Sequence, residues 1–108
     1  MNINTNVKSV LMQINDLSKQ LYQCLVKEHD ALSLNKLEKL LSLSEQKQLL
    51  VTQLDELDKQ RLALSGSKDF VSFLKSIDAR FVNFWEMAKK SVTKCHQQNK
   101  INGLLLQR

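Results

Sequence analysis

Apolar residues recur at alternating spacings of three and four along almost the whole chain, and this spacing is the strongest constraint on the fold. The first such row contains Val7, Val10, Ile14, Leu17, Leu21 and Cys24, and Glu28 then falls on the same line. Positions with this spacing share one face of an α-helix and form the seam of a bundle or coiled coil. The 108 residues include no proline and only two glycines, whereas β-rich folds need frequent turn residues. The sequence therefore predicts a single all-α domain, an elongated antiparallel helical bundle or coiled-coil hairpin of three long helices.

The predicted helices cover residues 5–32, 36–64 and 68–101 or onward. The first break falls beside Asn35, which Glu38 follows three residues later, a spacing typical of a capping box at a helix start. Ser42 and Glu45 repeat that spacing, so a second helix divided into a short and a long part stays open as an alternative. Gly66 marks the second break, because glycine readily takes the left-handed conformation that ends a helix. Five of the six aromatic residues follow this break, and we expect the third helix to anchor the core.

Two features set the predicted second helix apart. Its apolar seam is interrupted by Lys47 and Arg61, and charged residues at such positions usually extend toward solvent or fix the register of the helices. A second apolar row on the same helix consists of Leu37, Leu41, Val51 and Leu62. This helix is therefore expected to be apolar over more than one narrow stripe.

Glu28, on the row of the first helix, is expected to mark looser packing near that helix's end.

The residue groupings that enzymes and metal sites require are not found in this sequence. The two glycines stand far apart and form no phosphate-binding loop. Cys95 and His96 are neighbours, but adjacent side chains on a helix point about 100° apart. Cys24 and Cys95 lie on apolar rows, where reduced, buried thiols are expected. We therefore expect no enzymatic activity, no cofactor and no metal ion, and the lack of a long uninterrupted apolar run predicts no membrane insertion.

The basic residues are concentrated in the last third of the chain. The net charge is +5, and residues 67–108 contain eight basic and three acidic residues. Lys89, Lys90, Lys94 and Lys100 could contact phosphates, which keeps a basic helical nucleic-acid-binding protein as an alternative function. No aromatic residues are interleaved with these lysines and no base-reading module fits, so nucleic acid is not the expected partner.

The end of the chain combines amides, a glycine and three consecutive leucines. Asn99 and Asn102 are three residues apart and would share one face of a helix. Gly103 either permits a close approach of another backbone or ends the helix, and we favour a helix that continues through it. Three leucines then add apolar surface that completes the bundle or forms part of a groove for a partner helix, and both interpretations stay open. The predicted partner-binding residues are Val92, Cys95, Asn99, Asn102, Gly103, Leu104, Leu105 and Leu106.

The tail pattern of Asn99, Asn102-Gly103 and Leu105-Leu106, which begins four residues after Cys95, resembles the signature of the FlgN family of flagellar export chaperones. The leucine-rich run upstream is similar to that family's helical hairpin. It contains Glu28, Leu32, Leu37, Leu40, Leu43, Lys47, Leu50, Leu54, Leu57 and Arg61. Members of the family usually continue for a few more helical turns, so part of the substrate-binding tail is expected to be missing after Arg108.

This resemblance implies a cytoplasmic, all-α chaperone without ATPase activity. Such a protein would bind the helical terminal segments of the hook-associated proteins, which form the hook–filament junction. It would prevent their premature assembly and deliver them to the flagellar type III export apparatus. A structural coiled-coil oligomer is the main alternative, and sedimentation would distinguish the two.

Overall fold

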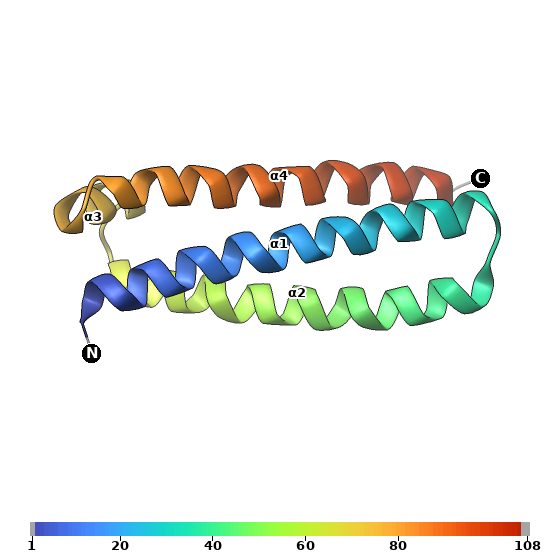
Figure 1. The fold of residues 1–108 in the computed structure, drawn as a ribbon, viewed down its shortest axis with the longest axis horizontal. Helices are drawn as coiled ribbons and strands as arrows, with labels where there is room; N and C mark the ends of the chain where they lie inside the picture. Colours follow the sequence, from blue (N-terminus) through green and yellow to red (C-terminus); the bar gives the residue numbers. More distant parts are fainter. Residues whose placement is uncertain (1, 107–108) are drawn as a thin grey trace.

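The computed structural model describes residues 2–106, which form four helices (Figure 1). The helices are α1 (Ile3–Ser33), α2 (Leu37–Ser65), α3 (Phe70–Ile77) and α4 (Arg80–Leu106). The predicted all-α class is confirmed, and the molecule is elongated, with extents of 49 × 22 × 21 Å. The second helix is continuous, so it is not divided into a short and a long part.

The prediction of three helices is wrong in its last element, because the predicted helix over 68–101 is two helices. The break lies at Asp78, whose backbone is extended, with φ −161° and ψ 119°. The Asp78 carboxylate accepts a 2.9 Å hydrogen bond from the backbone N–H of Arg80 and a 2.8 Å bond from its guanidinium. These bonds satisfy a free donor at the start of α4, as an N-cap residue does. The short helix α3 therefore turns at one end of the bundle before α4 begins.

Helix α1 is the central element of the bundle. It packs along its length against α2 on one side and α4 on the other, whereas α2 and α4 make few contacts with each other. Figure 1 shows α1 and α4 running in the same direction and α2 running in the opposite one, with α3 at the end where α1 begins. Because one helix separates the other two, a groove remains between α2 and α4.

The turn between α1 and α2 differs in detail from the predicted capping box. Asn35 adopts a left-handed conformation with φ 55°, which asparagine tolerates better than most residues. The backbone N–H of Lys36 donates a 2.9 Å hydrogen bond to the carbonyl of Ala31 and so closes the end of α1. Asn35 thus belongs to the turn, and α2 begins after Lys36 without a side-chain cap.

The core consists of three successive clusters of buried side chains. The cluster beside α3 is aromatic, as expected, and contains Val7, Leu11, Phe70, Phe73, Leu74 and Phe81. The middle cluster contains Val10, Ile14, Leu57 and Ala88. The cluster near the α1–α2 turn contains Leu21, Cys24, Leu25, Ala31, Leu43, Leu50 and Cys95. The predicted seam of α1 is therefore the central line of the core.

Candidate partner-binding site

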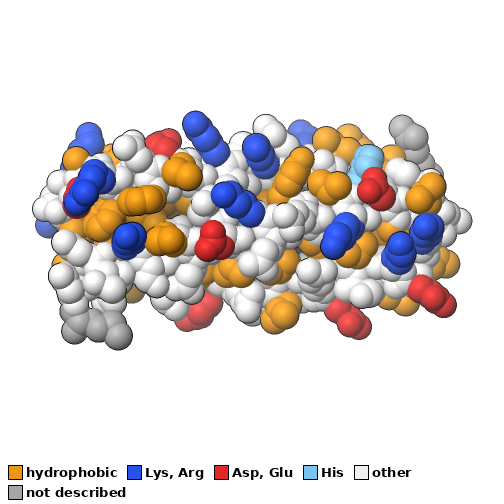
Figure 2. Space-filling model, in the orientation of Figure 1, with side chains coloured by type: hydrophobic (Ala, Val, Ile, Leu, Met, Phe, Trp, Pro, Cys, Tyr) orange, Lys and Arg blue, Asp and Glu red, His pale blue; other side chains and the backbone are white. Residues whose placement is uncertain are grey.

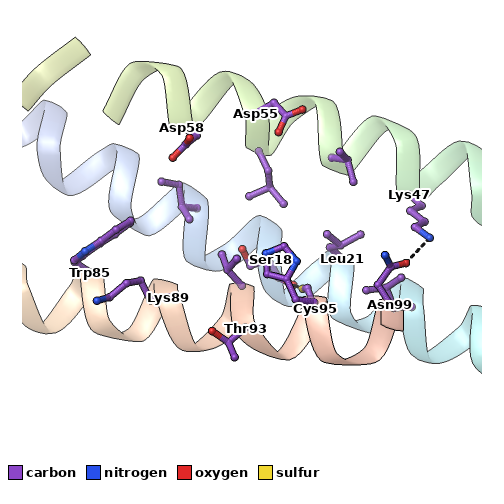
Figure 3. Close-up of a pocket in the computed structure, with 16 residues that line it drawn as sticks. Ser18, Leu21, Lys47, Asp55, Asp58, Trp85, Lys89, Thr93, Cys95 and Asn99 are labelled. Atoms are coloured by element: carbon purple, nitrogen blue, oxygen red, sulfur yellow. Dashed lines mark hydrogen bonds between the residues drawn. The ribbon is translucent and has the colours of Figure 1, made fainter. Parts of the chain in front are cut away.

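A groove with a volume of about 510 Å³ lies between α2 and α4, with α1 as its floor. Figure 3 shows the two helices on either side of it and α1 between them. Most of the lining is apolar and comes from all three helices: Ile14, Leu21 and Leu25 of α1, Val51 and Leu54 of α2, and Trp85 and Val92 of α4. We refer to this feature as the α2–α4 groove. Apolar side chains in an open groove of this kind are what an amphipathic helix requires for binding.

Two contacts cross the α2–α4 groove and mark its ends. The Lys47 ammonium donates a 2.7 Å hydrogen bond to the Asn99 side-chain oxygen (dashed in Figure 3). The Arg61 guanidinium lies 5.0 Å from the centre of the Trp85 ring, within the range of a cation–π contact. Fourteen residues separate the two contacts on each helix. At 1.5 Å per residue the groove is about 21 Å long, which matches roughly four turns of a bound helix.

The two walls of the groove carry opposite charges between the two end contacts, nearer to the Arg61 end. Asp55 and Asp58 line the α2 wall, and Lys89 lines the α4 wall (Figure 3). Asp58 and Lys89 form their ion pairs within their own helices, since Arg61 contacts Asp58 at 2.8 Å and Lys89 contacts Glu86 at 3.0 Å. The facing walls therefore present charge to the groove without being joined across it.

A polar cluster ties the three long helices together at one end of the groove. The Glu28 carboxylate is buried and accepts hydrogen bonds from the Asn102 amide at 2.9 Å and from Lys47 at 3.5 Å. Lys47 in turn bonds to Asn99 of α4. Glu28 is therefore held by hydrogen bonds to two other helices. The looser packing that its place on the apolar row predicted is wrong. Hydrogen bonds that link a buried charge to several elements both satisfy the charge and fix the geometry.

Asn102 is the predicted site residue most deeply embedded in the fold. Its side chain is only 1% exposed and its amide donates a 2.8 Å hydrogen bond to the carbonyl of Leu25. Its oxygen accepts a 3.0 Å bond from Gln98. Cys95 is buried as well, and its thiol donates to the carbonyl of Ser18 at 3.0 Å. Both residues hold α4 against α1, although the Cys95 side chain also contributes to the groove lining.

The other predicted site residues lie at the groove or beyond its end. Val92 is half-buried in the α4 wall, and Asn99 is exposed where the Lys47 contact crosses. The helix continues through Gly103, as favoured from the sequence, and Leu104 is 58% exposed while Leu105 is half-buried. The side chain of Leu106 lies outside the part that the structure describes. The predicted set is therefore spread over about four turns of α4 rather than gathered at one point.

Gly103 occupies a helical position with open space around it. A Cβ atom built at this residue would meet no other atom within 4 Å, and its backbone has no positive φ. A helical glycine is less favourable than alanine by up to about 1 kcal/mol. No close contact within the described chain requires a glycine here.

Val51, Leu37 and Leu62 of the second apolar row lie on the side of α2 that faces the groove. Val51 lines the groove, and at 100° per residue Leu37 and Leu62 lie within about 40° of it around the helix. Leu37 lies beyond the Lys47 end of the groove and is 68% exposed, and Leu62 lies beyond the Arg61 end and is also exposed. The neighbouring Leu41 is 70% exposed. The sequence identified this row, and in the structure Val51 packs against the core cluster near the α1–α2 turn, whereas Leu37, Leu41 and Leu62 are exposed.

The lysines of α4 do not form one phosphate-binding face. At 100° per residue Lys100 lies within about 20° of the groove-lining Lys89, whereas Lys90 and Lys94 lie more than about 90° away from it around the helix. On the face drawn in Figure 2, basic side chains are spread along the whole length, with acidic and hydrophobic ones between them. This distribution does not favour the nucleic-acid-binding alternative.

The two thiols are buried and are not activated as nucleophiles. Burial raises the pKa of the Cys24 and Cys95 thiols above the ordinary range, which disfavours the nucleophilic thiolate. Within residues 2–106, no three His, Cys, Asp or Glu side chains are placed to hold a metal ion together. In the same part of the chain, no helix is both long and apolar enough to cross a bilayer.

Comparison with protein-family models gives one finding for this chain. The model described as FlgN protein matches residues 1–108, the whole sequence. Comparison with curated proteins found no match, and comparison with solved structures found none either.

Proposed function

This chain belongs to the FlgN family of flagellar chaperones, and on that premise we propose that it is a cytoplasmic chaperone for hook-associated proteins. In this proposal it binds their helical terminal segments, prevents premature assembly and delivers them to the flagellar type III export apparatus. The observation that supports it most directly is the α2–α4 groove, which is mostly apolar and suits about four turns of helix.

The groove explains how such a chaperone would keep its partner from assembling. A terminal segment that assembles through an amphipathic helix exposes an apolar face while it is monomeric. Laid in the groove, that face would cover Val51, Leu54 and Val92, which are incompletely buried in the unbound chain. Burial of apolar surface contributes about 25 cal/mol per Å², so covering both surfaces stabilises the complex. The same face is then unavailable for assembly until export releases it.

The proposed partner-binding residues are those of the tail together with the groove walls. Val92 would contact the bound helix directly, and Asn99 would meet it where the groove ends. Leu104 and the leucines beside it would extend the apolar contact past that end. Asn102 would act indirectly, by holding this part of α4 against α1.

The proposal is tested by co-expression with hook-associated proteins followed by size-exclusion chromatography. We expect co-elution of the chaperone with at least one of them, and Val51→Asp should weaken the complex about tenfold or more, because it places a charge against the apolar face. Leu49→Asp is the matched control, since Leu49 is exposed on α2 and does not line the groove. Failure of every hook-associated protein to co-elute would refute the proposed partner class. Equal loss in both variants would refute the groove as the site.

A further inference from the structure

The charges on the groove walls point to a particular kind of bound helix. We propose that the α2–α4 groove selects an amphipathic helix with a basic flank toward α2 and an acidic flank toward α4. This inference rests on the proposed function, namely that the groove holds a helical segment. It adds the charge pattern that this segment carries beside its apolar face.

The register of the two walls places the opposite charges at the same level. Lys47 contacts Asn99 and Arg61 contacts Trp85, so α2 and α4 are antiparallel with a constant offset along the groove. This register brings Asp58 level with Lys89. Asp55 lies about one turn nearer to the Lys47 end on the same wall. A helix lying between the walls therefore meets carboxylates on one side and an ammonium on the other.

The wall charges are available to a partner because their present interactions are weak. Asp58 pairs with Arg61, and Lys89 pairs with Glu86 and lies 5.7 Å from the centre of the Trp85 ring. The side chains of Asp58, Lys89 and Glu86 are about half exposed, whereas that of Arg61 is 15% exposed. An exposed pair such as Lys89–Glu86 contributes about 0–1 kcal/mol, so exchanging it for partner contacts costs little. Asp55 forms no salt bridge with any residue that the structure describes.

The remaining charged groups at the groove stand at its ends. Lys47 is held by Asn99 and Glu28, and Arg61 lies over Trp85 and beside Asp58. His96 and the buried Cys95 thiol, both of α4, are the other titratable groups in the lining. Between these ends, the charged lining residues are Asp55 and Asp58 on the α2 wall and Lys89 on the α4 wall. A helix with two acidic flanks meets repulsion from Asp55 and Asp58, and one with two basic flanks meets repulsion from Lys89.

Three designed peptides test this charge pattern directly. Each has about 18 residues and the same leucine face, with lysine on one flank and glutamate on the other, glutamate on both flanks, or lysine on both flanks. Binding to the full chain is measured by fluorescence anisotropy at about 0.05 M and 0.3 M salt. We expect the mixed peptide to bind about threefold to tenfold more tightly than either uniform peptide at low salt, with a smaller difference at high salt.

Charge-reversal variants should change the preference in a defined way. Asp55→Lys with Asp58→Lys makes both walls basic, so the peptide with two acidic flanks should become the tightest ligand. Lys89→Glu makes both walls acidic and should favour the peptide with two basic flanks. Glu56→Lys and Lys90→Glu are the matched controls, because both residues are exposed neighbours that do not line the groove. The controls should keep the wild-type order.

The outcomes separate this inference from the function on which it rests. Equal binding of the three peptides, or the same order in all variants, would overturn the charge pattern while leaving hook-associated partners in place. Loss of hook-associated binding with the peptide order retained would refute the partner class alone. Sedimentation that shows a dimer dissociated by Asp55→Lys with Asp58→Lys would assign the groove to a second copy of the chain and overturn the inference.

Discussion

The side-chain amide of Asn102 donates a 2.8 Å hydrogen bond to the main-chain carbonyl of Leu25 and so fastens the last part of α4 to α1. The same nitrogen lies 2.9 Å from the buried carboxylate of Glu28. Because Glu28 also contacts Lys47 of α2, this one position connects all three long helices. The end of the α2–α4 groove is therefore set by a polar cluster rather than by apolar packing.

Replacing Asn102 by alanine should destabilise the protein. The substitution leaves the Leu25 carbonyl and the Glu28 carboxylate with fewer donors in a buried place, and an unsatisfied buried group costs about 1–3 kcal/mol. Urea unfolding monitored by circular dichroism measures the change. Asn99→Ala is the control, because Asn99 is exposed and should change the free energy of unfolding by less than about 1 kcal/mol. Equal effects of the two substitutions would contradict the structural role of Asn102.

Gly103→Ala should stabilise the isolated protein. The position is helical and an added Cβ meets no atom, so the gain in helix propensity of about 0.5–1 kcal/mol is not offset by strain. Thermal or urea unfolding checks the gain. If the tail contacts a partner as proposed, the same variant should bind hook-associated proteins more weakly despite its greater stability. A destabilised variant would show that the space around Gly103 is occupied in the free chain.

The start of α4 should depend on the charge of Asp78. The hydrogen bonds from Arg80 lower the pKa of the Asp78 carboxyl below its ordinary value in the folded state. A depressed folded-state pKa adds stability above the unfolded pKa, near 3.8, and this stability is lost as the pH falls through the folded value. Asp78→Asn should therefore be less stable than wild type at pH 7, and the difference should shrink as the pH falls below about 4. A difference that is constant with pH would contradict the capping role.

The two cysteines should react slowly with thiol reagents in the native state. Both side chains are buried, and burial raises their pKa, so little thiolate is present at pH 8. Absorbance with a disulfide reagent should show two thiols that react quickly in urea and far more slowly in buffer. Ser91→Cys, at a half-exposed position of α4, provides a native-state comparison. Rapid labelling of wild type at the rate of that variant would contradict the packing of α1 against α2 and α4.

The long helices could be predicted from the sequence because each carries a continuous apolar row. The predicted ranges 5–32 and 36–64 differ from α1 and α2 by at most two residues at each end. The break at Asp78 was missed because Ile77 and Phe81 keep the spacing of an unbroken helix across it. The informative signal was the aspartate itself, which favours N-cap positions and can accept bonds from the next turn.

The groove could be predicted only in part. The sequence identified Lys47, Arg61 and the second apolar row of α2, but it does not contain the register that brings Lys47 to Asn99 and Arg61 to Trp85. That register depends on packing between helices, including the burial of Ser18, Ala88 and Cys95 along the α1–α4 contact. Asn102 is predicted from the sequence to bind a partner. Its burial results from the packing of α4 against α1, which the sequence pattern does not contain. The partner-binding role of the tail residues stays a prediction.

The central claim is that a helical segment of a hook-associated protein lies between α2 and α4. Titration of such a segment into the ¹⁵N-labelled chain, followed by two-dimensional NMR, tests it most directly. The largest amide shifts should occur at groove residues such as Val51, Thr93 and His96, with small shifts at Glu56 and Lys90. Shifts confined to the outer residues, with the groove amides unchanged at saturation, would contradict it.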